Sequence, residues 1–127
     1  MAYAVMKKYG CSLFSGGFEW NGKILKPYGK SNNDGWEFNG SYLKPYGQSV
    51  SKGFEWNGKV LKPHGRSTFS GYDCSGSVIK PYGKANEKGW EVRNNRCQPF
   101  GKSINEGWEL QGEMPLPLIA LIVFDLA

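Results

Sequence analysis

One 15-residue stretch recurs along this chain: Gly53-Phe54-Glu55-Trp56-Asn57-Gly58-Lys59-Val60-Leu61-Lys62-Pro63-His64-Gly65-Arg66-Ser67. Near-copies begin at intervals of 18 residues, at Gly17, Gly35, Gly71, Gly89 and Gly107. Repetition at a fixed period indicates one small structural unit that is copied and packed against its neighbours. The structure of a single copy therefore sets the fold of the chain.

The composition favours short strands joined by many turns. The 127 residues include 18 glycines and 7 prolines, and 15% of them are aromatic. A hydrophobic content of 39% argues against disorder. The length suits one domain, which we take as residues 1–127. The net charge of +5 permits anionic partners without requiring them.

Each copy carries the signals of a β-hairpin. In the first copy, Phe18-Glu19-Trp20 alternates apolar and acidic residues, Asn21-Gly22 supplies a turn, and Lys23-Ile24-Leu25-Lys26 returns. Asn-Gly accepts the positive φ angles of a type I′ turn, so we expect a two-residue turn that pairs Trp20 with Lys23. The sequence predicts an all-β fold of about six tandem hairpins in an antiparallel meander.

Alternation assigns one face of this sheet to the core and one to solvent. The expected core residues are Phe18, Trp20, Leu25, Trp36, Phe38, Leu43, Phe54, Trp56, Leu61, Tyr72, Cys74, Ile79, Trp90, Val92, Cys97, Trp108 and Leu110. The opposite face carries one acid in each copy: Glu19, Glu37, Glu55, Asp73, Glu91 and Glu109. These acids are spaced too evenly to form a catalytic pair, and cross-strand pairing with lysines is the expected role.

A solenoid with 18 residues per coil is the alternative fold. Its coils would stack about 4.8 Å apart and would align the acids in one column of like charges. In a hairpin meander the same acids lie two strands apart, and lysines can stand between them. The meander is therefore favoured.

The two ends of the chain differ from the repeats. Residues 1–16 read as an N-terminal half-repeat and residues 17–112 as the hairpin repeats. The apolar run in residues 113–127 is expected to form a buried C-terminal strand. Pairing of this strand with Ala2-Tyr3-Ala4-Val5-Met6 would close the sheet into a ring or barrel. The alternatives are an open twisted ribbon and a tail that meets another molecule.

Neither a catalytic residue nor a metal or cofactor site is predicted. His64 stands where other copies carry tyrosine or phenylalanine, which indicates an aromatic position rather than a catalytic one. Cys74 and Cys97 occupy core positions and are expected to be buried, reduced thiols. Gly29-Lys30-Ser31 lacks the earlier glycine of a phosphate-binding loop and is interpreted as turn chemistry.

The candidate binding residues follow the second strand of each copy, at a Pro-aromatic-Gly corner. They comprise the corner aromatic residues and the basic residues after them: Tyr28, Tyr46, His64, Tyr82, Phe100, Lys30, Arg66, Lys84 and Lys102. A second basic column is formed by Lys26, Lys44, Lys62 and Lys80. Aromatic and basic residues together suit stacking on a glycan or on single-stranded nucleic acid. A solvated face that keeps the protein in solution is the simpler interpretation.

The hairpins at Gly17 to Lys23, Gly35 to Gly40 and Gly53 to Lys59 resemble in design the tandem β-hairpin repeats of MORN proteins. The copies here are shorter and add a Leu-Lys-Pro-Tyr-Gly segment. The resemblance implies an extended sheet used as a scaffold or docking surface, and it transfers no functional residues.

These observations lead to an expected function, a non-enzymatic interaction or structural module with repeated surface sites. A protein partner or self-association is the favoured form of interaction. Glycan binding and nucleic-acid binding are the alternatives. The sequence lacks a secretory signal pattern and a spanning segment, so we expect a cytoplasmic protein.

Overall fold

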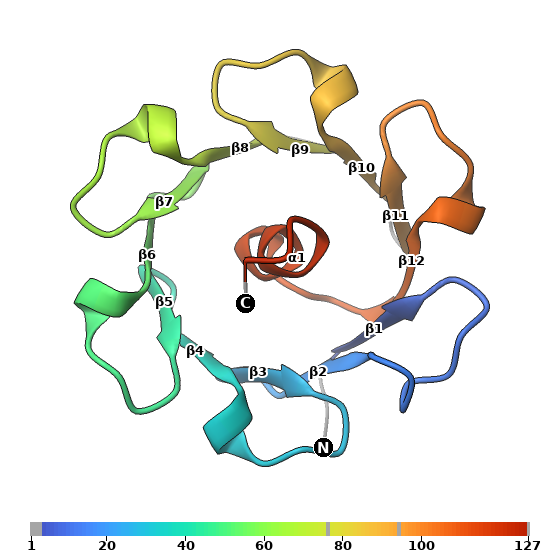
Figure 1. Ribbon diagram of the computed structural model, residues 1–127, viewed down its shortest axis with the longest axis horizontal. Coiled ribbons are helices and arrows are strands. Elements are labelled where there is room, and N and C mark those ends of the chain that lie inside the picture. Colours follow the sequence, from blue (N-terminus) through green and yellow to red (C-terminus); the bar gives the residue numbers. More distant parts are fainter. Residues whose placement is uncertain (1–3, 76, 94, 127) are drawn as a thin grey trace.

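The computed structural model describes residues 4–75, 77–93 and 95–126. Twelve antiparallel strands follow one another around a closed barrel, and one short helix lies inside it (Figure 1). The strands are β1 (Ala4–Lys8), β2 (Phe18–Trp20), β3 (Ile24–Pro27), β4 (Trp36–Phe38), β5 (Tyr42–Pro45), β6 (Phe54–Trp56), β7 (Val60–Pro63), β8 (Tyr72–Ser75), β9 (Val78–Pro81), β10 (Trp90–Val92), β11 (Arg96–Pro99) and β12 (Trp108–Gly112). The helix is α1 (Leu116–Val123). The predicted all-β hairpin meander, closed as a ring, is confirmed.

The ring closes because β1 pairs with β12 on one side and with β2 on the other. In the β1–β12 pair Lys7 faces Glu109, just as Lys26 faces Glu19 in the first complete copy. The two ends of the sequence thus form one further hairpin, and we call this β1–β12 junction the seam. Closure pairs every strand on both sides and leaves no open edge.

The structure excludes the alternative fold and corrects two expectations about the sheet. Antiparallel pairing of neighbouring strands excludes the solenoid. The partner of β1 is β12 rather than the C-terminal tail, and Ala2 and Tyr3 lie outside the described residues. The extended sheet implied by the resemblance to MORN repeats is instead a closed one.

The predicted hairpin register is wrong by two residues. Trp20 pairs with Leu25 rather than with Lys23. The side chain of Asn21 explains the longer turn, because its Oδ1 accepts the backbone N–H groups of Lys23 (3.0 Å) and Ile24 (2.8 Å). Positive φ occurs at Gly22 (95°) and not at Asn21, so the turn is not type I′. A shift of two leaves every side chain on its expected face.

The inward face is the predicted one. Equivalent positions of the second strands form a complete buried layer, in which each residue is at most 1% exposed. The layer consists of Met6, Leu25, Leu43, Leu61, Ile79 and Cys97. Aromatic residues of the first strands pack above and below it. The sheet alone does not fill the interior, because a ring of this many strands is wider than its own side chains can fill.

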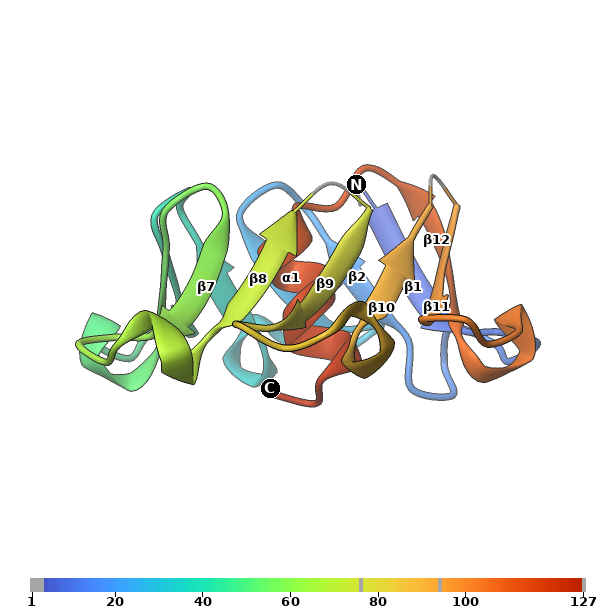
Figure 2. The ribbon, with the colours of Figure 1, turned by 90° about the horizontal axis from the view of Figure 1, so that it is seen from above.

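The expected C-terminal strand is wrong, because residues 116–123 form α1 at the centre of the ring (Figures 1 and 2). Pro117 lies in the first turn, where the missing N–H is tolerated. Leu118, Ile119, Ala120 and Leu121 are all at most 1% exposed. A helix that is apolar all round suits burial on every side, and with all twelve strands paired there is no edge left for another strand. Among the described residues, no helix has the length and hydrophobicity needed to cross a membrane.

The two ends of the ring differ. Hairpin turns line one end, whereas the corner loops spread outward at the other end as lobes (Figures 1 and 2). The lobes contain the 3-10 turns η1 (Asn32–Asp34), η2 (Val50–Lys52), η3 (Thr68–Ser70), η4 (Asn86–Lys88) and η5 (Ile104–Glu106). Each lobe returns to the sheet through a glycine. A Cβ atom on Gly53 would lie 2.1 Å from the carbonyl oxygen of Leu43, so only glycine fits there.

Candidate functional site

Every corner is held by the same backbone hydrogen bond. The N–H of the corner aromatic residue donates to the carbonyl of the glycine that opens the copy, as from Tyr28 to Gly17 (2.9 Å). The equivalent pairs are Tyr46–Gly35, His64–Gly53, Tyr82–Gly71, Phe100–Gly89 and, at the seam, Tyr9–Gly107. The bond joins the end of one lobe to the start of the next across the open end of a hairpin, so the aromatic side chains stand at equivalent places around the rim.

The recurring glutamate stabilises each corner on the outer face. In the third hairpin, Oε2 of Glu55 accepts the N–H of Gly65 (3.0 Å) and lies 2.9 Å from Nδ1 of His64. Nζ of Lys62 lies 2.9 Å from Oε1 and also donates to the carbonyl of Arg66 (2.7 Å). Lys62 and the Gly65 N–H lower the pKa of Glu55. The ionised Glu55 carboxylate therefore has a structural role in the corner.

The same arrangement recurs around the ring. A glycine N–H donates to the acid in the pairs Gly29–Glu19, Gly47–Glu37, Gly101–Glu91 and Gly10–Glu109. Ion pairs join Lys26 to Glu19 (3.0 Å), Lys44 to Glu37 (3.4 Å) and Lys7 to Glu109 (3.2 Å). These lysines are neutralised within their own hairpins, so most of the second basic column, Lys26, Lys44, Lys62 and Lys80, does not present free charge.

The Gly-Lys-Ser segment is part of this corner, as the sequence predicts. The N–H of Lys30 donates to the carbonyl of Pro27 (3.1 Å), and the carbonyl of Lys30 accepts a hydrogen bond from Nζ of Lys26. Both backbone groups of Lys30 therefore take part in the turn, and the next element is the three-residue 3-10 turn η1 rather than an α-helix. The arrangement lacks the helix N-terminus on which a phosphate-binding loop depends.

The predicted binding residues lie around the rim and do not converge. The corner aromatic residues are half-buried, apart from His64, which is exposed. The basic side chains that follow are exposed, and none makes an ion pair with a described residue: Lys30, Arg66, Lys84 and Lys102. Each lobe thus presents its own small aromatic and basic surface.

Two exposed phenylalanines extend this surface, and the sequence analysis missed them. Phe14 is 80% exposed and Phe69 is 81% exposed. Phe14 contacts Tyr28 edge-on with 4.9 Å between ring centroids, and Phe69 contacts Tyr82 edge-on at 5.5 Å. The available signal was an apolar aromatic residue within an otherwise polar loop.

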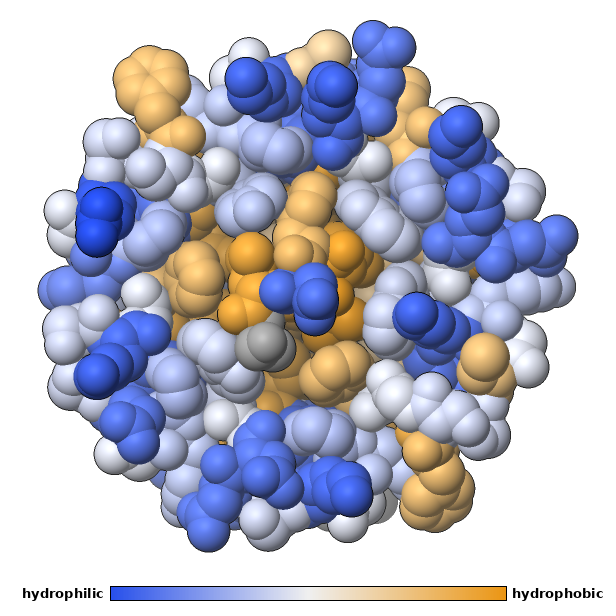
Figure 3. Space-filling view, in the orientation of Figure 1, coloured by the Kyte–Doolittle hydropathy of each residue, from blue (hydrophilic) through white to orange (hydrophobic). Residues whose placement is uncertain are grey.

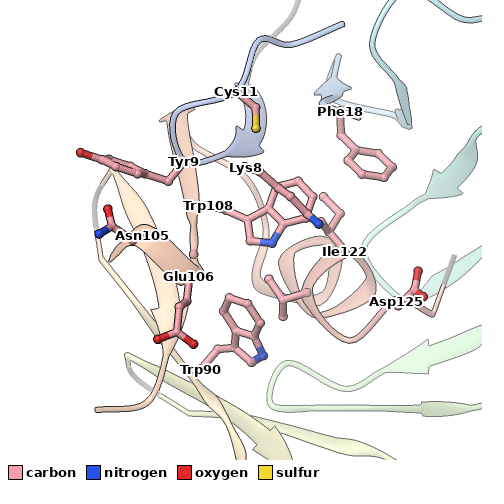
Figure 4. Close-up of a pocket in the computed structure, with 12 residues that line it drawn as sticks. Lys8, Tyr9, Cys11, Phe18, Trp90, Asn105, Glu106, Trp108, Ile122 and Asp125 are labelled. Atoms are coloured by element: carbon pink, nitrogen blue, oxygen red, sulfur yellow. The ribbon is translucent and has the colours of Figure 1, made fainter. Parts of the chain in front are cut away.

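A wide depression lies at the seam, where no binding residue was predicted. It has a volume of about 650 Å³, within the range of small-molecule sites. Phe18, Trp108 and Trp90 form an arc around the C-terminal end of α1, and Lys8 reaches across Trp108 (Figure 4). We call this the seam pocket; its remaining lining residues are Tyr9, Cys11, Asn105, Glu106, Gly107, Ile122, Val123 and Asp125.

The end of α1 contacts the wall of the ring at β8. The ring of Phe124, just after α1, lies 4.5 Å from the ring of Tyr72 in β8. On the side of Trp90 and Trp108 the helix leaves a gap. The space-filling view of this end shows an apolar centre surrounded by hydrophilic lobes (Figure 3). Val123, Phe124 and Leu126 are only partly buried there.

Two of the three cysteines lie in the core, and the third is exposed. Cys74 (3% exposed) and Cys97 (0% exposed) are buried as predicted, and burial raises the pKa of each thiol to about 12. Cys11 is exposed, and all three cysteines are free. Across residues 4–75, 77–93 and 95–126, no group of three His, Cys, Asp or Glu residues comes together in a way that would hold a metal ion.

Neither a scan of protein-family models nor searches of curated proteins and of solved structures returned a match.

Proposed function

We propose that the chain is a non-enzymatic interaction module that holds a protein partner at repeated sites around the rim of the ring. The proposal rests on one observation: the same corner, with an aromatic residue and an outward lobe, recurs around a closed sheet. Such repetition gives several weak contacts a fixed spacing. Simultaneous contacts raise overall binding far above that of a single contact.

The charges favour an acidic partner surface. The acids of the outer face are occupied by their own lysines and glycine N–H groups, which leaves the basic residues of the lobes as free positive charge. Four lobes carry one at the same position, namely Lys30, Arg66, Lys84 and Lys102. Complementary charge speeds association and fixes the orientation of a partner. We also propose a cytoplasmic location, where an exposed thiol such as Cys11 stays reduced.

Fluorescence anisotropy with a labelled poly-glutamate peptide tests this proposal. The first variant combines Lys30→Ser, Arg66→Ser and Lys102→Ser. The matched control removes the same charge from near the hairpin-turn end, with Lys23→Ser, Lys59→Ser and Arg96→Ser. We expect the lobe variant to weaken binding by about tenfold or more and the control to weaken it far less.

An equal loss in both variants would reduce the effect to net charge and overturn the proposal. Labelled single-stranded oligonucleotide and soluble oligosaccharides serve as parallel probes. Binding of either one through the lobes, without binding of the peptide, would replace the protein partner by a nucleic acid or a glycan.

A further inference from the structure

The seam pocket contains polar groups that the protein itself leaves unused. In the part of the chain that the structure describes, the side chains of Asn105, Glu106 and Asp125 make no hydrogen bond or ion pair. The ammonium group of Lys8 contacts only the face of Trp108, at 5.9 Å from its centroid. The outer face contrasts with this, because its glutamates are bonded within their own corners. Unused donors and acceptors beside an aromatic wall are typical of a ligand site.

The mixture of charges in the seam pocket limits the chemical class of ligand that it can bind. A quaternary or amine cation would suit the aromatic arc and the carboxylates of Glu106 and Asp125, but Lys8 already places a positive charge over Trp108. A strongly anionic ligand would suit Lys8 but would meet both carboxylates. A neutral, hydroxyl-rich ring satisfies all three groups, because each hydroxyl both donates and accepts. Its C–H faces would pack against Trp90, Trp108 and Phe18.

We propose that the seam pocket binds a short saccharide, with one sugar face against the Trp90–Trp108–Phe18 arc and hydroxyls on Lys8 and on the carboxylates at the two sides of the pocket. Asn105 and Glu106 stand on the outer side of Trp108, and Asp125 stands on the helix side (Figure 4). The sugar would therefore be held between the last lobe and the end of α1. This site is separate from the rim corners.

The seam pocket lies where the sequence departs from the repeat pattern. In the complete hairpins a proline faces the first aromatic residue, as Pro45 faces Trp36 and Pro99 faces Trp90. At the seam Lys8 takes the proline's place opposite Trp108. The loop from Tyr9 to Gly17 is one residue longer than its counterparts and contains no 3-10 turn. The pocket lies beside this one altered hairpin.

Asp125 adopts a backbone conformation that is unusual for a residue other than glycine. It has a φ of 56°, the only positive φ among the described residues other than glycine. Its N–H donates to the carbonyl of Ile122 (3.1 Å), and the next N–H, of Leu126, donates to that of Leu121 (2.9 Å), which ends the helix. Glycine is the residue that usually takes this position. An aspartate there places a carboxylate at the pocket instead.

The test is titration of the full chain with cellotriose and chitotriose, followed by tryptophan fluorescence and by ligand-observed saturation-transfer NMR. Tetramethylammonium chloride and inorganic phosphate are the cation and anion probes. We expect binding of a neutral trisaccharide with a Kd in the millimolar range or below, and weaker or no binding of either ion. Trp90→Ala should raise the Kd by about tenfold or more.

Trp36→Ala is the matched control, because Trp36 has the same register position and is also half-buried, but it lies outside the pocket. It should leave the Kd unchanged. Asp125→Asn and Lys8→Pro, the latter copying the other hairpins, serve as second variants that do not remove a packed ring. Each should weaken saccharide binding while binding of the poly-glutamate peptide by the rim persists.

Three results would overturn the proposal. They are the absence of saccharide binding by either readout, an equal loss in Trp36→Ala and Trp90→Ala, and binding of tetramethylammonium or phosphate in preference to both trisaccharides. Because the rim variants lie outside the pocket, failure of the saccharide site and failure of the rim proposal are separate results.

Discussion

The third hairpin (β6 and β7) and the seam (β1 and β12) share the same hydrogen bonds and ion pair but differ in one residue beside them. In both, a glutamate accepts a glycine N–H at 3.0 Å, from Gly65 to Glu55 and from Gly10 to Glu109. In both, a lysine completes an ion pair with the acid. The difference lies opposite the first aromatic residue, where the third hairpin has Pro63 and the seam has Lys8. The repeated residues therefore build the ring, and residues that break the repeat line the seam pocket.

The framework that both regions share depends on the packed interior of the ring. The largest effect on stability should therefore follow from a substitution in α1. Leu121 is 0% exposed. Leu121→Asp would bury an unpaired charge and should abolish cooperative folding. Leu121→Ala should lower the free energy of unfolding by about 2–5 kcal/mol. Chemical denaturation followed by circular dichroism measures both effects.

Phe69→Ala is the control, since Phe69 is 81% exposed, and it should change the free energy of unfolding by at most about 0.5 kcal/mol. A cooperative, native-like melt of Leu121→Asp would show that the ring is stable without its central helix.

The second prediction compares the closing strand with a strand in the middle of the chain. Met6 and Leu43 occupy equivalent positions, and both are 0% exposed. Replacing either with alanine should cost about 2–5 kcal/mol at equilibrium. The kinetics should differ, because Met6 pairs with Leu110, more than 100 residues away, whereas Leu43 pairs with Phe38 in its own hairpin. Contacts that close so long a loop are expected to form late in folding.

Stopped-flow denaturant jumps should therefore show that Met6→Ala mainly speeds unfolding and that Leu43→Ala mainly slows folding. The reverse pattern would place closure of the seam before formation of the hairpins.

The third prediction concerns the acid that both regions share. The N–H of Gly47 and the ammonium group of Lys44 hold the pKa of Glu37 below its ordinary value in the folded state. Its stabilising contribution is therefore present above the unfolded pKa, about 4.3, and is lost as the pH falls through the lower folded pKa. Glu37→Gln should reduce the loss of stability below about pH 5. Urea midpoints measured between neutral and acidic pH test this.

Glu87→Gln is the comparison variant, since Glu87 is exposed and makes no hydrogen bond or ion pair with any described residue. Glu87→Gln should leave the pH dependence of stability the same as in the unsubstituted protein. An identical pH profile for Glu37→Gln would mean that the corner bonds do not contribute to folding.

The smallest effect should come from the exposed thiol of the seam. Cys11 takes the place that basic residues such as Lys30 and Arg66 hold in other lobes. In the native protein it should react rapidly with a thiol reagent, whereas Cys74 and Cys97 should react only after denaturation because both are buried. Thiol titration counts the reactive groups, and a melting curve should show little change after modification. Fast reaction of a second thiol would contradict the burial of the core cysteines.

Much of the ring was predictable from the sequence because strand periodicity is local. The alternation in Phe18-Glu19-Trp20 fixes which face is buried whatever the turn, and a turn two residues longer keeps the same faces. The length of the turn was not predictable from Asn-Gly alone. It depends on the side chain of Asn21, which bonds two backbone N–H groups in competition with the short turn.

The helix and the pocket could not be predicted, because both depend on the width of the closed ring. An apolar run such as Leu118-Ile119-Ala120-Leu121 suits a buried strand and a buried helix equally well by periodicity. Only the empty centre of a twelve-strand barrel selects the helix. The pocket then lies between the end of α1 and the part of the wall that carries Trp90 and Trp108. The one signal available in the sequence was Lys8 in a place where the other hairpins have proline.

The position of α1 after β12 also has a consequence for synthesis of the protein. A ribosome completes all twelve strands before it makes the helix that fills their centre. Until then the inward faces of the sheet have nothing to pack against, and the earliest strand waits for a partner made near the end. Domains that fold during translation bury their apolar surface as they emerge. This chain can complete its core only after α1 has been made, so the apolar inward faces of its strands stay uncovered while the strands are synthesised.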